Sequence, residues 1–186
     1  MNLLFSKPPL LILQFLDSEK HLDILVNNAG LVQVKRYLTE DGNEMTFQCN
    51  HLGHFLLTNL LLNKLKESTA ARIVNVSSLA HAQIWTDKDG GKFDLDDLNC
   101  ENQDYNDGGT TYARSKLANV LFTKELAKRL APENNHVTTY VLHPGVVETE
   151  VWRSKDLPAE QGGNRVFYWF WIFFYPLIKL LFKNPR

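Results

Sequence analysis

Three short apolar runs alternate along the chain with two long segments in which apolar residues recur at helical spacing. The short runs are rich in β-branched residues and end on polar residues, Gly or Pro, which is typical of buried strands. They are residues 21–28, 72–78 and 136–142. The long segments, residues 41–66 and 112–130, predict helices. Strands that alternate with helices predict an α/β fold with a doubly wound parallel sheet covered on both faces, in one domain over residues 1–186.

The ends of the predicted strands indicate where a ligand would bind. In a parallel α/β sheet, ligands bind beyond the carboxyl ends of the strands, which meet at one edge. These ends are residues 27–30 (Asn-Asn-Ala-Gly), Ser77 with Ser78, and Pro144 with Gly145. The second long helix begins at the same edge, after a loop over residues 86–109 that is rich in Asp, Gly and Asn. We therefore expect the functional site at this edge.

Tyr112 and Lys116 open the second long helix and are candidates for acid/base chemistry. Residues four positions apart lie on the same face of a helix, so both side chains would point into one cleft. A nearby cation stabilises phenolate and lowers the pKa of a tyrosine from its usual value of about 10. Such a pair could pass a proton to or from an alcohol or a carbonyl. The alternative for an isolated Tyr-x-x-x-Lys match is two solvated side chains.

Composition and charge exclude some functional classes. The 186 residues are 44% hydrophobic and 22% charged, which is ordinary for a globular domain with an apolar core. The net charge is −1 with no basic run, so we expect no nucleic-acid partner. Cys49 and Cys100 are too few and too far apart to suggest a disulfide framework and favour a reducing compartment. The six His residues lack metal-ligand spacing, so we expect no metal.

The C-terminal residues 164–186 form an aromatic, apolar segment. The run from Val166 to Ile178 is shorter than the about 20 residues that span a bilayer, and basic residues flank it. Aromatic and basic residues in this arrangement favour a position in the membrane interface, and contact with the membrane surface is expected through Val166 to Phe182. The alternative is a buried helix, or an apolar patch that another part of a longer chain covers.

Five motifs in the middle of the chain occur in a characteristic order. They are residues 22–30 (LDILVNNAG), 50–55 (NHLGHF), 74–78 (VNVSS), 112–116 (YARSK) and 143–149 (HPGVVET). In this order they resemble the short-chain dehydrogenase/reductase family, over about residues 22–149. Finer features are similar to the retinol dehydrogenase group: residues 50–58, 77–81 and 115–122, and the long insertion before Tyr112.

The resemblance implies roles for four catalytic residues. Ser78, rather than Ser77, matches the serine that hydrogen-bonds the substrate oxygen, because it is the last residue of its motif. Tyr112 matches the general acid/base, and Lys116 matches the lysine that lowers the tyrosine pKa and binds the nicotinamide ribose. Asn50 matches the residue that holds a water relaying protons to the lysine. Outside the family context, a helix cap for Ser78 and a polar helix face for Asn50 would be the better interpretations.

The resemblance also implies a nicotinamide cofactor, with NADP expected and NAD as the alternative. At Asn28, Ala29 and Gly30 the backbone would approach the cofactor, where a Cβ on residue 30 would intrude. Asn27 is expected to tie neighbouring strands together instead. The other residues implied to bind cofactor are Tyr112, Lys116, Pro144, Gly145, Val147 and Thr149, of which Thr149 could hydrogen-bond the carboxamide.

The family's first strand and its glycine-rich turn have no counterpart here, because no Gly precedes Gly30. The sequence therefore predicts a partial Rossmann-like sheet that lacks the first strands, as in a fragment, an alternative product or an incomplete gene model of a longer enzyme. Two hypotheses follow. The chain is either an oxidoreductase or a catalytically incompetent, membrane-associated fragment that binds lipid or a partner protein.

The expected substrate of the oxidoreductase is a hydrophobic alcohol or aldehyde. A retinoid fits the branch resemblance and the aromatic C-terminal segment, and steroids and lipid aldehydes are the competitors. The same resemblance implies a membrane-associated protein of the endoplasmic reticulum whose domain faces the cytosol, with a cytoplasmic location as the alternative.

Overall fold

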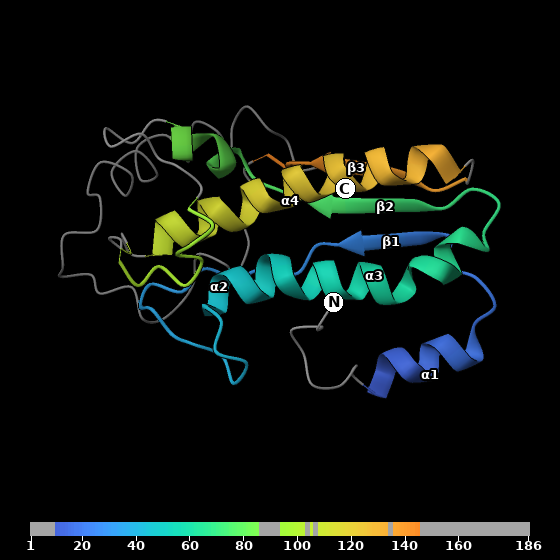
Figure 1. Ribbon diagram of the computed structural model, residues 1–186, viewed down its shortest axis with the longest axis horizontal. Helices are drawn as coiled ribbons and strands as arrows, with labels where there is room; N and C mark the ends of the chain where they lie inside the picture. The colour runs from blue at the N-terminus through green and yellow to red at the C-terminus, as the bar shows by residue number, and fades with distance from the viewer. Residues whose placement is uncertain (1–9, 86–93, 103–104, 106–107, 134–135, 146–186) are drawn as a thin grey trace, which may run out of the picture. The chain divides into compact units, whose positions relative to one another are not determined.

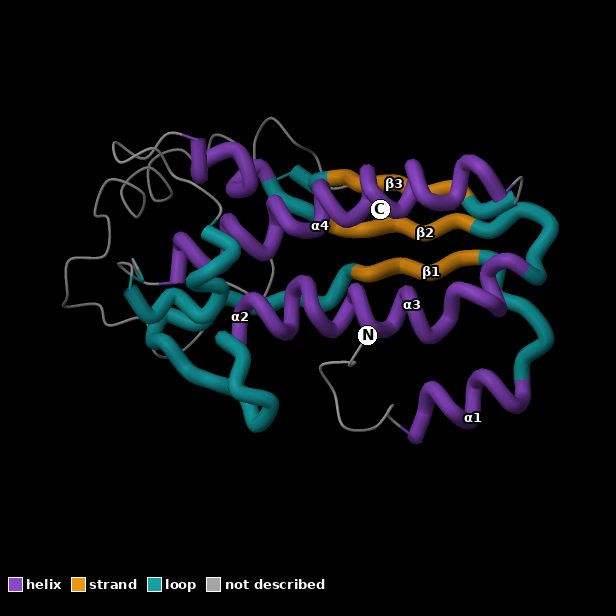
Figure 2. The backbone as a smooth tube through the Cα atoms, in the orientation of Figure 1, coloured by secondary structure: helices purple, strands orange, loops and turns teal. Residues whose placement is uncertain are grey.

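Three parallel strands in the order β1-β2-β3 form the centre of the structure, a computed structural model (Figures 1 and 2). They are β1 (Ile24–Asn27), β2 (Arg72–Val76) and β3 (Thr138–Leu142). Leu25 lies opposite Ile73, which lies opposite Thr139, so the three strands are in register. This arrangement confirms the α/β fold with a partial parallel sheet that the sequence predicts.

The chain divides into two units, Met1–Ser154 and Lys155–Arg186. The structure describes parts of the first unit: residues 10–85, 94–102, 105, 108–133 and 136–145. Val147, Thr149 and the aromatic segment 164–186 lie outside the described residues, so their expected roles stay predictions.

The first predicted helix is divided by a π-helical turn. A short helix α2 (Met45–Phe47) is followed by the π turn η1 (Gln48–Leu52) and by α3 (Gly53–Lys66). The helix begins at residue 45 rather than 41, because the Glu44 carboxylate accepts hydrogen bonds from the amides of Thr46 and Phe47, at 2.9 and 2.7 Å. An N-cap of this kind satisfies amides that have no partner within the helix.

The second predicted helix, α4 (Gly109–Leu130), begins slightly earlier than the sequence pattern suggests. Gly108 precedes it with φ +79°, and a Cβ added there would come within 2.0 Å of the Gln33 carbonyl oxygen. A glycine is therefore required where α4 starts against the loop that follows β1. Two 3₁₀ helices, η2 (Leu79–Trp85) and η4 (Ala131–Glu133), follow β2 and α4.

An N-terminal helix, α1 (Leu10–Ser18), lies beside α3 (Figure 1). Its residues Ile12, Phe15 and Leu16 pack against the main core, whereas Leu10 and Leu11 are exposed. None of the helices within the described ranges has the length and apolar character needed to cross a membrane.

The main core lies between the helices and one face of the sheet. Leu25 and Ile73 of the strands pack with residues of α3 and α4, and Leu65 and Ile73 are 0% exposed. In the described residues the opposite face of the sheet is open, and Ile24, Val26, Tyr140 and Leu142 are 55%, 54%, 49% and 44% exposed there. The sequence predicts a sheet covered on both faces, and the described part of the chain supplies helices to one.

A strip of buried polar side chains runs between the sheet and these helices. The Asn27 amide donates to Asn75 Oδ1 at 2.8 Å and to Thr58 Oγ1 at 2.9 Å. The Asn75 amide in turn donates to Thr123 Oγ1 at 2.9 Å. All four side chains are at most 4% exposed. Asn27 therefore ties β1 to β2 and to α3, as the sequence suggests, and Asn75 ties the sheet to α4.

We predict that Asn75→Ala lowers the free energy of unfolding by about 1–3 kcal/mol, because it removes a buried partner of Asn27 and Thr123. Urea denaturation of the purified chain measures this change. The matched control is Asn59→Ala, since the Asn59 side chain is exposed and bonds only within its own helix. Its effect should lie within about 0.5 kcal/mol. Equal effects of the two substitutions would contradict the role of the buried strip.

Candidate active site

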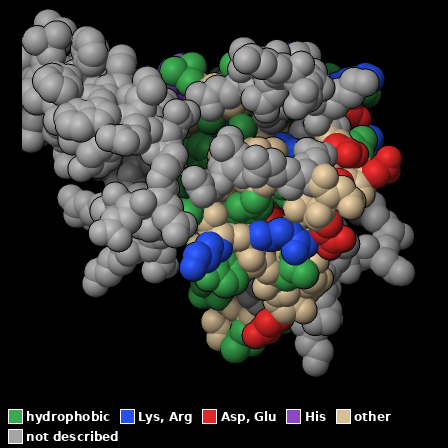
Figure 3. All heavy atoms as spheres, turned by 90° about the vertical axis from the view of Figure 1, so that its left-hand side faces the viewer, with side chains coloured by type: hydrophobic (Ala, Val, Ile, Leu, Met, Phe, Trp, Pro, Cys, Tyr) green, Lys and Arg blue, Asp and Glu red, His purple; other side chains and the backbone are tan. Residues whose placement is uncertain are grey.

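The carboxyl ends of the three strands and the N-terminus of α4 lie at the same edge of the sheet (Figure 1). The Ser77 amide donates to the Leu142 carbonyl at 2.7 Å, so the contact between the second and third strands continues to this edge. Figure 3 views this edge, where basic side chains lie next to apolar ones. The edge therefore gathers the residues that the sequence assigns to one site.

Tyr112, Ser78 and Lys116 form the centre of the site. The Tyr112 side chain is hydrogen-bonded to that of Ser78. Lys116 Nζ lies 5.6 Å from the centroid of the Tyr112 ring, within the range of a cation–π contact. Ser78 Oγ also accepts a hydrogen bond from the Ala80 amide at 3.2 Å, at the start of η2. A phenol, a hydroxyl and an ammonium group thus meet where a carbonyl or alcohol could be bound.

The pKa of Tyr112 shifts in the opposite direction from the sequence-based expectation. Burial raises the pKa of its phenol above 10, and the hydrogen bond with Ser78 opposes this shift to a smaller extent. Burial lowers the pKa of the Lys116 ammonium. Lys116 Nζ lies over the aromatic ring and donates to the Val76 carbonyl. A phenol is already protonated at neutral pH, and the raised pKa keeps it so to higher pH, which suits Tyr112 to act as an acid.

Lys116 is held by hydrogen bonds at its side-chain ammonium and at its backbone carbonyl. The residue is 4% exposed, and its Nζ donates to the Val76 carbonyl at 3.1 Å. Its own carbonyl accepts a hydrogen bond from Ser77 Oγ at 2.8 Å. Ser77 thus anchors α4 to the end of β2, while Ser78, the next residue, turns to Tyr112.

Asn50 lies within the π turn and is 0% exposed. Its Oδ1 accepts from the Leu31 amide at 2.8 Å, and its Nδ2 donates to the Leu31 carbonyl at 2.9 Å and to Ser115 Oγ at 3.1 Å. Single π turns are frequent at functional sites because they re-aim side chains. Here the turn directs Asn50 at the loop after β1 and at α4. The side chain thus makes three hydrogen bonds, and the Asn50 backbone carbonyl accepts one from Asn119 Nδ2 at 3.0 Å.

The loop after β1 exposes residues 28–30 beside Asn50 and Lys116. Asn28, Ala29 and Gly30 are exposed. A Cβ added at Gly30 would lie 3.2 Å from Asn50 Oδ1 and 3.5 Å from Lys116 Nζ. The glycine therefore gives Asn50 and Lys116 the room they occupy. On the other side of the site, Pro144 and Gly145 follow β3 and are exposed. The expected contacts of Val147 and Thr149 lie outside the described residues.

Two buried polar residues of the site were not singled out from the sequence. Ser115 donates to the Tyr112 carbonyl at 2.7 Å and accepts from Asn50, and Asn119 donates to the Asn50 carbonyl at 3.0 Å. Both belong to α4 and are at most 1% exposed. Polar residues at the inward positions of an apolar-periodic helix were the available signal, but only the fold identifies what they contact.

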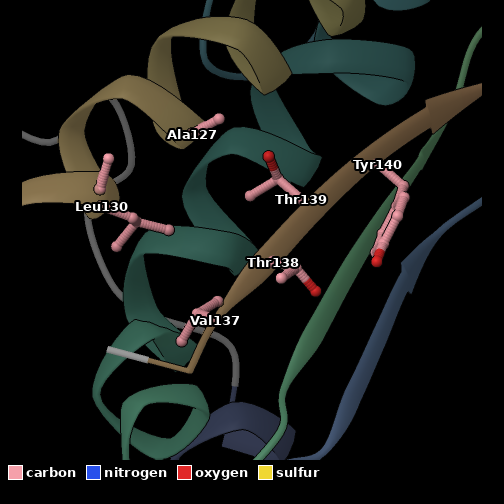
Figure 4. Close-up of a pocket in the computed structure, with 7 residues that line it drawn as sticks. Ala127, Leu130, Val137, Thr138, Thr139 and Tyr140 are labelled. Atoms are coloured by element: carbon pink, nitrogen blue, oxygen red, sulfur yellow. The ribbon is translucent and has the colours of Figure 1, made fainter. Parts of the chain in front are cut away.

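A pocket elsewhere in the fold does not coincide with this site. It lies between the C-terminal part of α4 and β3, and Leu130, Val137, Thr138 and Tyr140 are among the residues that line it (Figure 4). The residues that line the pocket do not include Tyr112 or Lys116. They come from the C-terminal end of α4 and from residues 137–140. Within the described ranges, no group of three or more His, Cys, Asp or Glu residues could hold a metal ion.

The chain is similar in sequence to relatives of known name. The sequence profile described as short chain dehydrogenase matches residues 11–87. Retinol dehydrogenase 13 of Homo sapiens is 51% identical over 173 residues, which make up 93% of this chain and 47% of that protein. Retinol dehydrogenase 14 of Homo sapiens is 52% identical over 145 residues, covering 78% of this chain and 40% of that protein. The chain thus spans about half the length of the curated relatives it matches.

Solved structures share the arrangement of strands and helices. An uncharacterized protein from Mycobacterium paratuberculosis is 41% identical with a TM-score of 0.61, and the match covers 75% of this chain and 48% of that one. The Pseudomonas aeruginosa RhlG/NADP active-site complex is 27% identical with a TM-score of 0.53, over 77% and 50% of the two chains. By sequence and by fold, the chain belongs to the short-chain dehydrogenase family and resembles its retinol dehydrogenase branch.

Proposed function

We propose that the chain is an NAD(P)-dependent oxidoreductase that transfers a hydride between a nicotinamide cofactor and a hydrophobic alcohol or aldehyde. The observation that carries this proposal is the contact of Tyr112 with Ser78 beneath the Lys116 ammonium, at the strand ends where α/β sheets bind ligands. A phenol that is hydrogen-bonded to a hydroxyl and lies beside a buried cation matches the needs of carbonyl reduction.

The proposed chemistry assigns a separate task to each side chain. The Ser78 hydroxyl hydrogen-bonds the substrate oxygen and orients it toward the Tyr112 phenol. Tyr112, which is protonated at neutral pH, donates its proton to the oxygen as the carbonyl is reduced. Lys116 stabilises the phenolate that remains, because its Nζ lies above the ring. Asn50 holds the loop after β1 and, as the family resemblance implies, a water that relays protons to Lys116.

The residues present fit the nicotinamide end of a dinucleotide. When bound, that cofactor supplies the hydride and carries the difficult chemistry. The exposed backbone of residues 28–30 leaves room beside Lys116 for a ribose. A Cβ at Gly30 would lie 3.2 Å from Asn50 Oδ1 and 3.5 Å from Lys116 Nζ. Lys116 and Tyr112 would bind its hydroxyls, and Pro144, Gly145, Val147 and Thr149 would lie along the nicotinamide. We propose NADP as the cofactor, with NAD as the alternative, since one related structure is described as an NADP complex.

A retinoid is the proposed substrate, on the basis of the names of the relatives, with a steroid or a lipid aldehyde as the alternative. We also propose that Val166 to Phe182 contacts a membrane surface, in which a hydrophobic substrate would dissolve. A membrane of the endoplasmic reticulum with the domain facing the cytosol is the proposed location, and the cytoplasm is the alternative.

A second candidate function belongs to a different class. The exposed apolar side chains Ile24, Val26, Tyr140 and Leu142 on the open face of the sheet favour association with lipid or a partner protein. In that case the chain would be a catalytically incompetent, membrane-associated protein that keeps the motifs by descent. Cofactor binding distinguishes the two functions.

Titration of the purified chain with NADPH, followed by nicotinamide fluorescence, should give saturable binding within the range of about 1 μM to 1 mM typical of enzyme ligands. Gly30→Ala should weaken this binding, because the added Cβ would lie 3.2 Å from Asn50 Oδ1, so that the Asn50 side chain must shift. Gly53→Ala is the matched control, since its Cβ would meet only the Gln48 carbonyl, at an ordinary distance of 3.4 Å. If the unaltered chain does not bind NADPH at millimolar concentration, the oxidoreductase proposal fails and the second function is favoured.

Tyr112→Phe should lower kcat for the reduction of retinal by about 10²–10⁴-fold, because it removes the proton donor. NADPH should still bind, with an affinity reduced only by the loss of one ribose contact, since Lys116 remains. Tyr105→Phe is the control, because its hydroxyl donates to Glu44 at 2.8 Å, away from Ser78 and Lys116. Turnover of retinal, a steroid ketone and a long-chain aldehyde, measured by NADPH oxidation, also ranks the substrates. Full activity of the Tyr112→Phe protein would refute the assigned role.

A further inference from the structure

Asn119 joins three elements of the site at one point. It lies on α4, on the same side as Lys116, and is 1% exposed. Its Nδ2 donates to the Asn50 carbonyl at 3.0 Å and reaches the Val76 carbonyl at 3.4 Å. The Val76 carbonyl is also the acceptor for Lys116 Nζ, at 3.1 Å. The π turn, the end of β2 and α4 are thus connected through one amide.

The orientation of this amide determines the tautomer of a neighbouring histidine. Because the Asn50 and Val76 groups are carbonyls, the end of Asn119 that faces them must be the NH₂ group. Its Oδ1 then points to His51 Nδ1, 2.9 Å away, and can only accept a hydrogen bond. His51 Nδ1 therefore carries a proton and donates it to Asn119.

His51 is in turn held in place by aromatic rings. Its ring centroid lies 5.4 Å from that of Phe47, 6.3 Å from that of Phe55 and 6.1 Å from that of Phe122. Burial lowers the pKa of His51, so the ring stays neutral at physiological pH. The π turn and α4 both contribute to this packing, which leaves the ring little freedom to turn away from Asn119.

We propose that Asn119 and His51 form a positioning pair that holds the Asn50 peptide against α4 and so sets the position of Asn50 relative to Lys116. Neither side chain reaches the reacting atoms. His51 orients the Asn119 amide, and the amide holds the carbonyl of Asn50, whose side chain in turn holds Leu31. The effect of this pair on turnover rests on the proposed function, whereas the hydrogen bonds themselves do not.

Four variants separate the hydrogen bonds from packing and stability. Asn119→Leu removes both ends of the amide at similar size. His51→Phe keeps an aromatic ring but cannot donate, and His51→Asn keeps a donor near the position of Nδ1. Thr58→Val is the control, because Thr58 lies in α3 and its substitution removes a buried hydrogen bond from Asn27 of β1 rather than one made by the pair.

The first measurement is nuclear magnetic resonance of the full chain and does not depend on activity. Histidine ring nitrogen spectra should show neutral His51 with its proton on Nδ1, and Asn119→Leu should abolish this preference. The Leu31 amide resonance, which reports its bond to Asn50, should shift in Asn119→Leu and His51→Phe but not in Thr58→Val. A proton on Nε2 in the unaltered chain, or an unchanged Leu31 resonance in both variants, would overturn the proposal.

The second measurement is kinetic. Asn119→Leu and His51→Phe should lower kcat by about 100-fold with little change in KM, on the scale of an ångström-sized displacement of catalytic groups. His51→Asn should restore most of the loss, and Thr58→Val should keep kcat. Equal kcat values for His51→Phe and His51→Asn would show that the hydrogen bond has no role. An unaltered chain that neither binds NADPH nor turns over would refute the proposed function, while the spectra would still decide the arrangement of the pair.

Discussion

The burial of the Lys116 ammonium is the constraint on which the rest of the site depends. A buried cation is tolerated only when hydrogen bonds replace its lost water, and the Val76 carbonyl supplies one of them. The end of β2 must therefore lie directly under α4. Ser77 secures the same contact from the strand side by donating to the Lys116 carbonyl. With the lysine held in this way, its Nζ has one position above the Tyr112 ring.

The interior of the fold changes character along the sheet. At the amino-terminal ends of the strands, Leu65, Ile73 and other apolar residues form a close-packed core. Toward the carboxyl ends, Asn27 and Asn75 replace them and connect the strands to the helices by hydrogen bonds. Hydrogen bonds are directional, so this half of the interior specifies positions more strictly than apolar packing does. The site lies at the end of the polar half, where distances between groups matter most.

The π turn links the loop after β1 to α4. An uninterrupted α-helix would rotate the residues after the turn differently, and Asn50 could then not serve Leu31 through its side chain and Asn119 through its carbonyl. The opposite face of the sheet does not contribute to this link. In the part of the chain that the structure describes, it presents exposed apolar side chains. The hydrogen bonds that set the geometry of the site therefore lie on the helix-covered side of the sheet, apart from the exposed face.

The sequence by itself determined the order of strands and helices, the edge where the site lies and the identity of Ser78, Tyr112, Lys116 and Asn50 as candidates. The order of the elements and the edge follow from periodicity, which local chain geometry controls, whereas Ser78 and Asn50 became candidates through the resemblance of short motifs to the family. The tertiary structure alone decided that Asn50 lies in a π turn, that burial raises the pKa of Tyr112, and that Asn119 belongs to the site. The contacts responsible join residues far apart in the chain, by 40 positions for Lys116 and Val76 and by 69 for Asn119 and Asn50. Pairings over such separations depend on how the elements pack, and periodicity within one element carries no information about them.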